Sequence, residues 1–183
     1  MSPIIAIGGL HGIGKSTISK GLAKRFKLRY LSAGQVFRQM AKKKNLALHE
    51  FSKLADEDPS VDLEIDNLIK IEAEKGDTIA EGQLAPWMLK EVADMKILLT
   101  APEKVRINRI ARRERISFDE AKKNTAIREK NEKERYKKYY NIDVSDVSIY
   151  DLIFDTSLLR KEQTIKTLEA MVKSYLTKSF KKR

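Results

Sequence analysis

Residues 3–17 read PIIAIGGLHGIGKST, and this stretch decides the fold. Its first part, 3–8, is a short apolar run that predicts a buried strand. Residues 9–16 then match the pattern G-x-x-x-x-G-K-S/T, and the apolar residues Ile18, Leu22 and Phe26 follow at intervals of four. This spacing predicts a helix that opens at 15–17. A strand, a glycine loop and a helix N-terminus in this order are typical of a nucleotide phosphate-binding loop.

Glycines let backbone N–H groups approach a triphosphate closely, and the helix N-terminus adds a positive end. We expect Lys15 to lie along the β- and γ-phosphates, and the Ser16 hydroxyl to be a ligand of Mg²⁺. His11, at the loop tip, is expected to face solvent without a catalytic role. The ATP-binding residues predicted here are Gly9, Leu10, His11, Gly12, Ile13, Gly14, Lys15, Ser16 and Thr17. The alternative is a glycine-rich turn that only joins a strand to a helix.

Length and composition are those of a single globular domain: 183 residues, 42% hydrophobic and 34% charged. The apolar runs are too short to span a bilayer, so we expect a cytoplasmic protein without a membrane partner. With no cysteine and two separated histidines, the metal to expect is the Mg²⁺ that accompanies the nucleotide. The net charge of +11 indicates a polyanionic partner, but no recognisable nucleic-acid motif is present, which disfavours DNA or RNA.

Strand and helix patterns alternate along the rest of the chain. Further strands are predicted at 28–31, 78–80, 95–100 and 152–154, with helices between and after them. Such alternation predicts an α/β fold with a parallel sheet and helices on both faces. Two helices, around 48–54 and over 60–75, interrupt the alternation and are expected to form a small helical arm over the acceptor side of the site.

Polar residues that follow two strands form a second candidate site. Ser32 and Gly34 end the second strand, and Arg38 lies one turn into the next helix, where it could clamp a second phosphate. The alternative is a capped helix with a surface arginine. Glu81 and Gly82 end the third strand, and Glu81 is expected to hold Mg²⁺ through water or to bind the acceptor, rather than to cap a helix.

Trp87, just beyond this turn, could line a pocket for a nucleotide base or pack in the core. Thr156 and Ser157 could border the adenine.

Pro102 opens a helix that carries several arginines and breaks near 114–116. The next helix begins at Ser117, and Glu120 completes a capping box. We therefore expect an arginine-lined hairpin that closes over ATP. The arginines in question are Arg106, Arg109, Arg112 and Arg113.

One stripe of the second hairpin helix carries Arg128, Glu132 and Arg135, spaced four and three residues apart. The pattern fits two structures. One is a salt-bridge ladder within the helix. The other is a site in which two arginines grip a phosphate while the carboxylate between them orients them.

These segments together resemble the archaeal-type cytidylate kinases, which belong to the nucleoside monophosphate kinases. The resemblance covers almost the whole chain. It rests on GGLHGIGKST (8–17), SAGQVFRQMA (32–41), AEGQLAPW (80–87) and IREKNEKERYKKYYNIDVSDVSIYDLIFDTS (127–157). The glycine loop alone would indicate only a nucleotide hydrolase, whereas the long last segment is specific to the family.

The resemblance implies a five-stranded parallel P-loop core over 1–34, 76–105 and 148–183, with an acceptor-binding arm over about 35–75 and a lid over about 106–140. It also implies transfer of a phosphoryl group from ATP to CMP or dCMP. Arg38, Arg128 and Arg135 would bind the acceptor phosphate, and Arg109 and Arg113 would stabilise the transferring group. The chain departs from the family at Gln83, where an arginine is expected. Any acceptor contact at that position is in doubt.

Three alternatives stay open at this level. The acceptor could be AMP or UMP, or it could be an unphosphorylated nucleoside or small metabolite, which would not need three phosphate-binding arginines. A protein of another class, a nucleotide switch or a nucleic-acid-binding protein, would also fit the basic charge. We expect a monomer that acts on ATP and CMP or dCMP.

Overall fold

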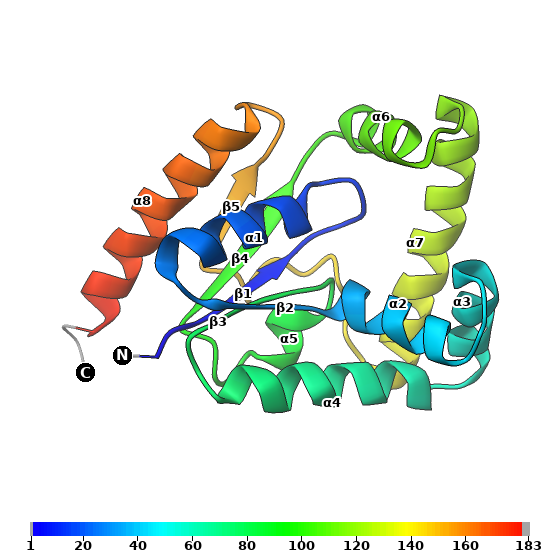
Figure 1. Ribbon diagram of the computed structural model, residues 1–183, viewed down its shortest axis with the longest axis horizontal. Coiled ribbons are helices and arrows are strands. Elements are labelled where there is room, and N and C mark those ends of the chain that lie inside the picture. The colour runs from blue at the N-terminus through cyan, green and yellow to red at the C-terminus, as the bar shows by residue number, and fades with distance from the viewer. Residues whose placement is uncertain (1, 181–183) are drawn as a thin grey trace.

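Five strands form one fully parallel sheet in the computed structural model, which describes residues 2–180. Their order is β2-β3-β1-β4-β5 (Figure 1). The strands are β1 (Ile4–Gly8), β2 (Arg29–Ser32), β3 (Thr78–Glu81), β4 (Met95–Thr100) and β5 (Leu152–Asp155). The α/β fold with five parallel strands is therefore confirmed, and each strand agrees with its sequence-predicted range to within one residue at either end.

Helices cover both faces of this sheet (Figure 1). They are α1 (Lys15–Phe26), α2 (Ala33–Lys43), α3 (Leu48–Glu57), α4 (Ser60–Glu74), α5 (Ala85–Met88), α6 (Glu103–Glu114), α7 (Phe118–Tyr140) and α8 (Lys161–Phe180). Only the four-residue α5 was not expected; it carries Pro86 in its first turn, where a proline is tolerated. Within residues 2–180, none of these helices is both long and apolar enough to cross a membrane.

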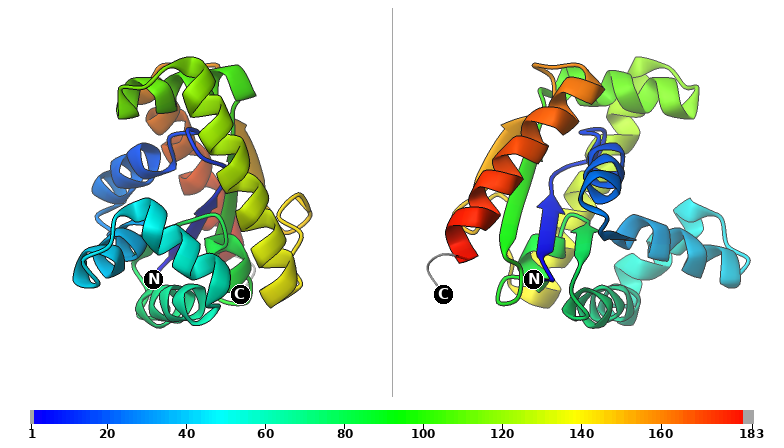
Figure 2. Two further views of the ribbon diagram at one scale, coloured as in Figure 1. Left: turned by 90° about the vertical axis from the view of Figure 1, so that its right-hand side faces the viewer. Right: turned by 60° about the vertical axis from the view of Figure 1, so that its left-hand side comes forward.

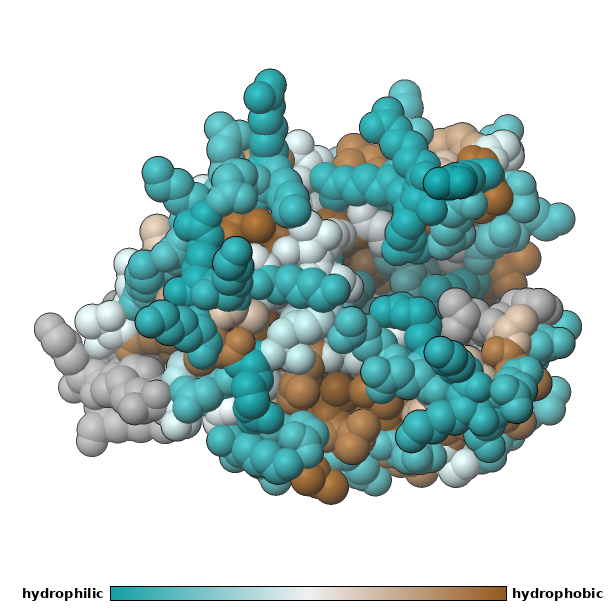
Figure 3. Space-filling model, in the orientation of Figure 1, coloured by the Kyte–Doolittle hydropathy of each residue, from teal (hydrophilic) through white to brown (hydrophobic). Residues whose placement is uncertain are grey.

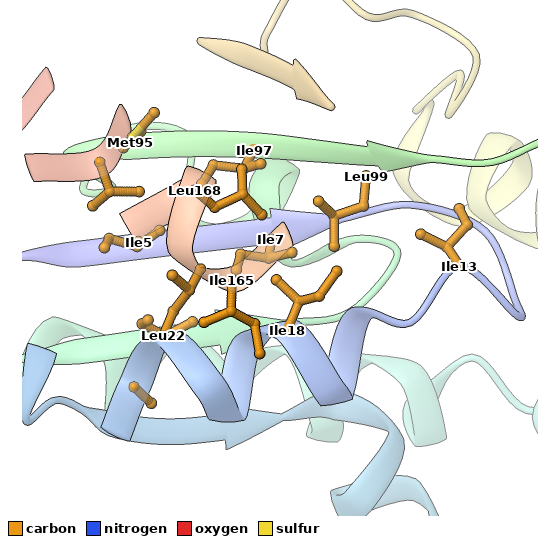
Figure 4. Packing of buried hydrophobic residues seen from close by; sticks show 13 residues of the cluster. Ile5, Ile7, Ile13, Ile18, Leu22, Met95, Ile97, Leu99, Ile165 and Leu168 are labelled. Atoms are coloured by element: carbon orange, nitrogen blue, oxygen red, sulfur yellow. The ribbon is translucent and has the colours of Figure 1, made fainter. Parts of the chain in front are cut away.

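Strand β1 distributes its side chains to two separate cores because successive residues point to opposite faces of a sheet. Ile5 and Ile7 are fully buried on the face covered by α1 and α8. Figure 4 shows them packed against Leu22 of α1 and Leu168 of α8, with side chains of β4 completing the layer. Burying aliphatic side chains of this size stabilises the fold by roughly 1.5–3 kcal/mol each, so this layer holds α1 and the loop before it in position.

The opposite face of the sheet is covered mainly by α4. Ile4 and Ala6 of β1 belong to the same core cluster as Ile65, Ile69 and Ala73 of α4. The sequence-predicted arm thus has two unequal parts, since α4 packs on the sheet while α2 and α3 extend away from it (Figure 1). The division of the chain into core, arm and lid stays a prediction.

Helices α6 and α7 form the expected hairpin around a small apolar cluster of their own. Ile107 and Ile110 of α6 pack with Ala121 of α7 in this cluster. The Ser117 hydroxyl accepts a hydrogen bond from the Glu120 backbone N–H at 3.2 Å and caps α7. Helix α7 then runs along one side of the molecule from α6 to α4 (Figure 2). One long helix therefore connects the region of the glycine loop with the arm.

Candidate active site

The loop between β1 and α1 has the tight backbone that its glycines predict. Gly9 and Gly12 have φ values of +130° and +76°. A Cβ on Gly9 would lie 2.4 Å from the Leu99 carbonyl oxygen, and one on Gly12 would lie 2.5 Å from the Arg106 carbonyl oxygen. Both positions therefore require glycine, for conformation and for close approach. The contact with Arg106 places the loop directly against the backbone of α6.

Lys15 lies at the start of α1 and turns back over the loop. Its Nζ donates to the Gly9 carbonyl at 2.6 Å and to the Leu10 carbonyl at 2.8 Å. Burial lowers the pKa of the Lys15 ammonium, whereas the nearby Glu81 carboxylate raises it. The Lys15 ammonium group is thus held against two backbone carbonyls of the loop.

Glu81, at the end of β3, collects three hydroxyl groups on one oxygen. Its Oε1 accepts from Ser16 at 2.8 Å, from Tyr30 at 2.9 Å and from Ser32 at 2.5 Å. The side chain is buried, and the Ser32 hydroxyl also accepts from the Gln35 backbone N–H, so Ser32 caps α2 as well. The two interpretations of Ser32, a helix cap and a site residue, are therefore compatible.

One cavity of about 850 Å³ is lined by residues of the glycine loop, of α2, α3 and α4, and of α6 and α7. The sequence-predicted residues that line it are His11, Gly12, Ile13, Gly14, Lys15, Ser16, Thr17, Gly34, Arg38, Glu81, Gly82, Arg109, Arg113, Arg128, Glu132 and Arg135. Three others do not line it: Gly9, Leu10 and Ser32. Ser32 is connected to the cavity through its hydrogen bond to Glu81. Thr156 also lines the cavity, whereas Trp87 and Ser157 do not.

The two lid arginines predicted to be catalytic have different surroundings. Arg109 is braced by the protein, because its guanidinium donates to the Ile13 carbonyl at 3.0 Å and to the Thr156 hydroxyl at 2.9 Å. Arg113 is largely exposed and pairs with the neighbouring Glu114 at 2.6 Å. Arg109 is therefore fixed beside the loop, whereas Arg113 lies at the rim of the cavity.

The stripe on α7 forms one ion pair within the helix and a second set of contacts with the arm helices α3 and α4. Phosphate binding by its arginines stays a prediction. Arg128 and Glu132 form an ion pair within the helix at 2.9 Å. Arg135 instead crosses to the arm, where its Nε donates to Asp62 at 2.5 Å and its Nη1 donates to Asp56. Glu132 therefore does not orient both arginines. Carboxylates of α3 and α4 orient Arg135, because α7 lies against these helices.

The expectation that His11 faces solvent is wrong. Its Nε2 lies 2.7 Å from Glu132 Oε2, and the side chain is only 18% exposed. Gln83 Nε2 lies 2.5 Å from the same carboxylate oxygen and 2.9 Å from His11 Nε2. The loop tip is covered because α7 passes directly over it, an arrangement that no local pattern around His11 indicates.

Other residues of the site carried no clear sequence signal. Asp62 and Asp66 line the cavity from α4, and their spacing of four residues places them on one helix face beside the apolar residue Ile65. Burial raises the pKa of Asp66 to about 6, and the Tyr140 hydroxyl donates to its Oδ2 at 2.6 Å. Tyr30 could have been found, because it lies two residues before Ser32 and so on the same face of β2.

Positive charge surrounds the cavity on several sides. The cations that line it are Lys15, Arg38, Arg109, Arg113, Arg128, Arg135 and Lys161. Figure 3 shows hydrophilic side chains around the hollow between α6 and α2. Phosphate groups carry the charge that such a set of cations would bind, with arginines as bidentate partners.

Comparisons with known proteins agree with this geometry. A model of the cytidylate kinase-like family matches residues 4–74 and 66–158. A cytidylate kinase of Staphylothermus marinus is 42% identical over 173 residues, which cover 94% of this chain and 98% of that protein. A cytidylate kinase of Methanocaldococcus jannaschii is 47% identical over 157 residues, which cover 84% of this chain and 88% of that protein.

Solved structures share the fold at low sequence identity. A shikimate kinase from Bacteroides thetaiotaomicron superimposes with a TM-score of 0.66 at 14% identity, and the match covers 94% of this chain and 99% of that one. A gluconokinase from Sinorhizobium meliloti gives 0.64 at 9% identity, with 100% and 98% covered. These two likenesses support the P-loop kinase fold alone. On the family match and the identity to its archaeal relatives, the chain belongs to the cytidylate kinase-like family.

Proposed function

We propose that this protein is a nucleoside monophosphate kinase that transfers the γ-phosphoryl group of ATP to CMP or dCMP, giving ADP and CDP or dCDP. The observation that carries this proposal is one cavity in which the glycine loop lies together with several further cations. Lys15 lines the cavity beside the loop, and Arg38 of α2 and both Arg128 and Arg135 of α7 line it as well. Two phosphorylated substrates could therefore bind facing one another, as direct transfer between them requires.

The proposed reaction needs no covalent intermediate with the protein. An oxygen of the acceptor phosphate forms a bond to the γ-phosphorus while the bond to the β–γ bridging oxygen breaks, and ADP leaves. A phosphate monoester is largely deprotonated at neutral pH, since its second pKa is about 6, so no general base is required. The protein's part is to align the two phosphates and to neutralise charge. Lys15 and Arg109 could do this, because both line the cavity and both donate to carbonyls of the loop.

Mg²⁺ is the metal that the residues present would suit. The Ser16 hydroxyl and the Glu81 carboxylate are 2.8 Å apart beside the loop, and Mg²⁺ prefers oxygen ligands with several retained waters. We infer that Ser16 would hold the ion directly and Glu81 through water. When bound with ATP, the ion would neutralise negative charge that develops on the β- and γ-phosphates.

The proposal is tested by measuring ADP formation from ATP and Mg²⁺ with CMP, dCMP, UMP, AMP and GMP supplied separately. CMP and dCMP should be preferred by a wide margin. A preference for AMP or UMP would be compatible with the proposed phosphate-binding sites, but it would reject cytosine as the base of the acceptor. Turnover of none of these acceptors would reject the proposal.

The role of Lys15 is tested by Lys15→Ala. We expect kcat to fall by several powers of ten, because neutralisation at the loop is a large share of catalysis in phosphoryl transfer. Lys20→Ala is the matched control, since it removes the same charge from the exposed face of α1, over the Tyr30 ring. Full activity of Lys15→Ala, with unfolding curves that match the wild type, would contradict the proposed site.

A further inference from the structure

His11 is held at three separate points by the elements that surround the loop. Its Nε2 lies 2.7 Å from Glu132 Oε2, and its backbone N–H donates to Glu129 Oε1 at 3.3 Å. Its carbonyl accepts from the Arg106 guanidinium at 2.9 Å. Helices α6 and α7 therefore fix both the main chain and the side chain of the residue at the tip of the nucleotide loop.

The hydrogen-bonding pattern assigns the proton of His11. Gln83 Nε2 and His11 Nε2 both lie within hydrogen-bonding distance of Glu132 Oε2, at 2.5 and 2.7 Å. A carboxylate oxygen can accept two donors, whereas the Gln83 amide N–H could not donate to a nitrogen that already carries a hydrogen. We therefore assign both nitrogens as donors to Oε2. Burial lowers the pKa of His11, which favours a neutral imidazole protonated on Nε2.

Glu132 connects this donor pair to an arginine of the acceptor side. Its second oxygen, Oε1, accepts from Arg128 Nε at 2.9 Å. The carboxylate is buried, and although burial opposes ionisation, the hydrogen bond from His11 and the charge of Arg128 lower its pKa. A continuous chain of hydrogen bonds thus runs from the loop tip through Glu132 to Arg128, whose side chain is half exposed to the cavity.

We propose that His11 is a positioning residue that couples the nucleotide loop to the acceptor side of the cavity through Glu132 and Arg128. The inference rests on the proposed function, because it needs two nucleotides in one cavity. A triphosphate on the loop restrains the backbone at His11, and the hydrogen bond then restrains Glu132 and Arg128. The acceptor nucleotide meets an arginine that is already oriented, so each nucleotide strengthens the binding of the other by the same factor.

Gln83 has a defined part in this arrangement. Its amide supplies the second donor to Glu132 Oε2 without adding a positive charge next to His11 and Arg128. The residue at the position where the sequence analysis expects an arginine therefore contacts the carboxylate of Glu132 directly. Its place in the site is to hold Glu132 beside the loop tip.

The test compares His11→Gln with His11→Leu. The glutamine amide can donate to Glu132 from about the position of His11 Nε2, whereas leucine fills the space without a donor. For each protein, the Kd of a non-hydrolysable ATP analogue is measured with and without saturating CMP, and the ratio of the two values is the coupling factor. We expect a factor in the range of about 5–150 for the wild type, a value near unity for His11→Leu, and recovery of most of the factor in His11→Gln.

Steady-state kinetics provide a second measurement. If His11 had only a structural role, its replacement would not change the KM for CMP and kcat in the following way. In His11→Leu, the KM for CMP measured at saturating ATP should rise by a larger factor than kcat falls. In His11→Gln, both values should return towards those of the wild type. Unfolding curves without nucleotide check the fold. If His11→Leu does not fold, His11→Asn, whose amide is too short to reach Glu132, takes its place.

Each outcome decides the proposal. A coupling factor in His11→Leu equal to that of the wild type would overturn it, and so would equal losses in the leucine and glutamine variants. Turnover of CMP by the wild-type protein is measured in the same series. If the proposed function is wrong, the wild-type protein will not turn over CMP, and this result does not depend on the comparison of the variants.

Discussion

One carboxylate oxygen, Oε1 of Glu81, brings together three hydroxyls from different parts of the fold. Ser16 comes from α1, whereas Tyr30 and Ser32 come from β2. All three donate, so a single charge at the end of β3 determines the direction of each O–H bond. The lone pairs of Ser16 are thereby turned away from Glu81 and left available to a cation.

Glu81→Gln is expected to disturb this arrangement while keeping the shape of the side chain. The amide removes the negative charge, while its oxygen can still accept from the hydroxyls. We expect kcat/KM to fall roughly 10–100-fold, and the Mg²⁺ concentration for half-maximal activity to rise.

Tyr30→Phe is the control for Glu81→Gln, because it removes one donor and leaves the charge in place. Steady-state assays over a Mg²⁺ titration compare the two variants. An unchanged Mg²⁺ requirement in Glu81→Gln would rule out a role for this carboxylate near the metal.

Asp66 provides a prediction about pH. Burial raises its pKa to about 6, from an ordinary value of 3.8. A carboxyl whose pKa is higher in the folded state stabilises the fold below the pKa of the unfolded state, and this contribution is lost as the pH rises through about 6. Relative to Asp66→Asn, the wild type should therefore lose about 2 kcal/mol of unfolding free energy between about pH 4 and about pH 7.5.

Denaturant unfolding of both proteins at the two pH values measures this difference. The amide oxygen of Asp66→Asn can still accept from the Tyr140 hydroxyl. The variant therefore keeps this hydrogen bond but cannot ionise, which makes it the control for the ionisation of Asp66. A difference between wild type and variant that does not change with pH would show that Asp66 titrates normally.

At the scale of elements, the hairpin of α6 and α7 brings cations to the loop and also carries the contacts of His11. Its second helix begins with a single side-chain cap, the Ser117 hydroxyl on the Glu120 N–H. Before it, α6 ends at Glu114, and the next residue, Arg115, is in the left-handed region with φ +58°. The direction of the hairpin depends on these local features as well as on its small apolar cluster.

Ser117→Ala should lower the unfolding free energy by about 1 kcal/mol, because the Glu120 N–H loses its acceptor. Ser174→Ala is the control: this serine is exposed within α8, where alanine is the better helix former and a neutral or slightly stabilising effect is expected. Thermal or denaturant unfolding distinguishes the two. Equal stability of both variants would show that the cap contributes nothing to α7.

Secondary structure and the loop could be predicted from the sequence because their signals are local. The pattern of glycines and Lys15, and the alternation of strands and helices, indicated the sheet to within a residue at most ends. The partners of His11 and Arg135 could not be predicted, because they depend on where α7 crosses the loop, α3 and α4. That path is determined by tertiary packing. The periodicity of α7 shows which residues share a face, but not which elements this face contacts, because charged residues lie on both its buried and its exposed sides.

At the scale of the whole molecule, the net charge of +11 is consistent with substrates that carry several phosphates. Much of this charge lies on exposed surface, where it would attract anions from a distance and be screened by salt. Specific contacts inside the cavity would be screened less. The same charge could also attract nucleic acid without specificity.

Raising NaCl from about 50 mM to about 500 mM should therefore increase the KM values for ATP and CMP several-fold and change kcat much less. Steady-state kinetics at constant Mg²⁺ measure this, with choline chloride as a check that the effect depends on ionic strength and not on Na⁺. Loss of kcat with constant KM would place the salt effect on a catalytic step. Tight binding of DNA or RNA without turnover of any monophosphate would favour the alternative class of function.

The position of β1 has a consequence for how the protein is made on the ribosome. This strand precedes the other four in the sequence, yet it lies in the middle of the sheet, and its two neighbours begin only at Thr78 and Met95. A nascent chain that ends before β4 has an unpaired edge on β1 and lacks the Leu99 carbonyl against which Gly9 packs. Long-range pairing of this kind delays folding. The nucleotide loop, although it is synthesised before both neighbours of β1, should acquire its shape only after β4 has left the exit tunnel.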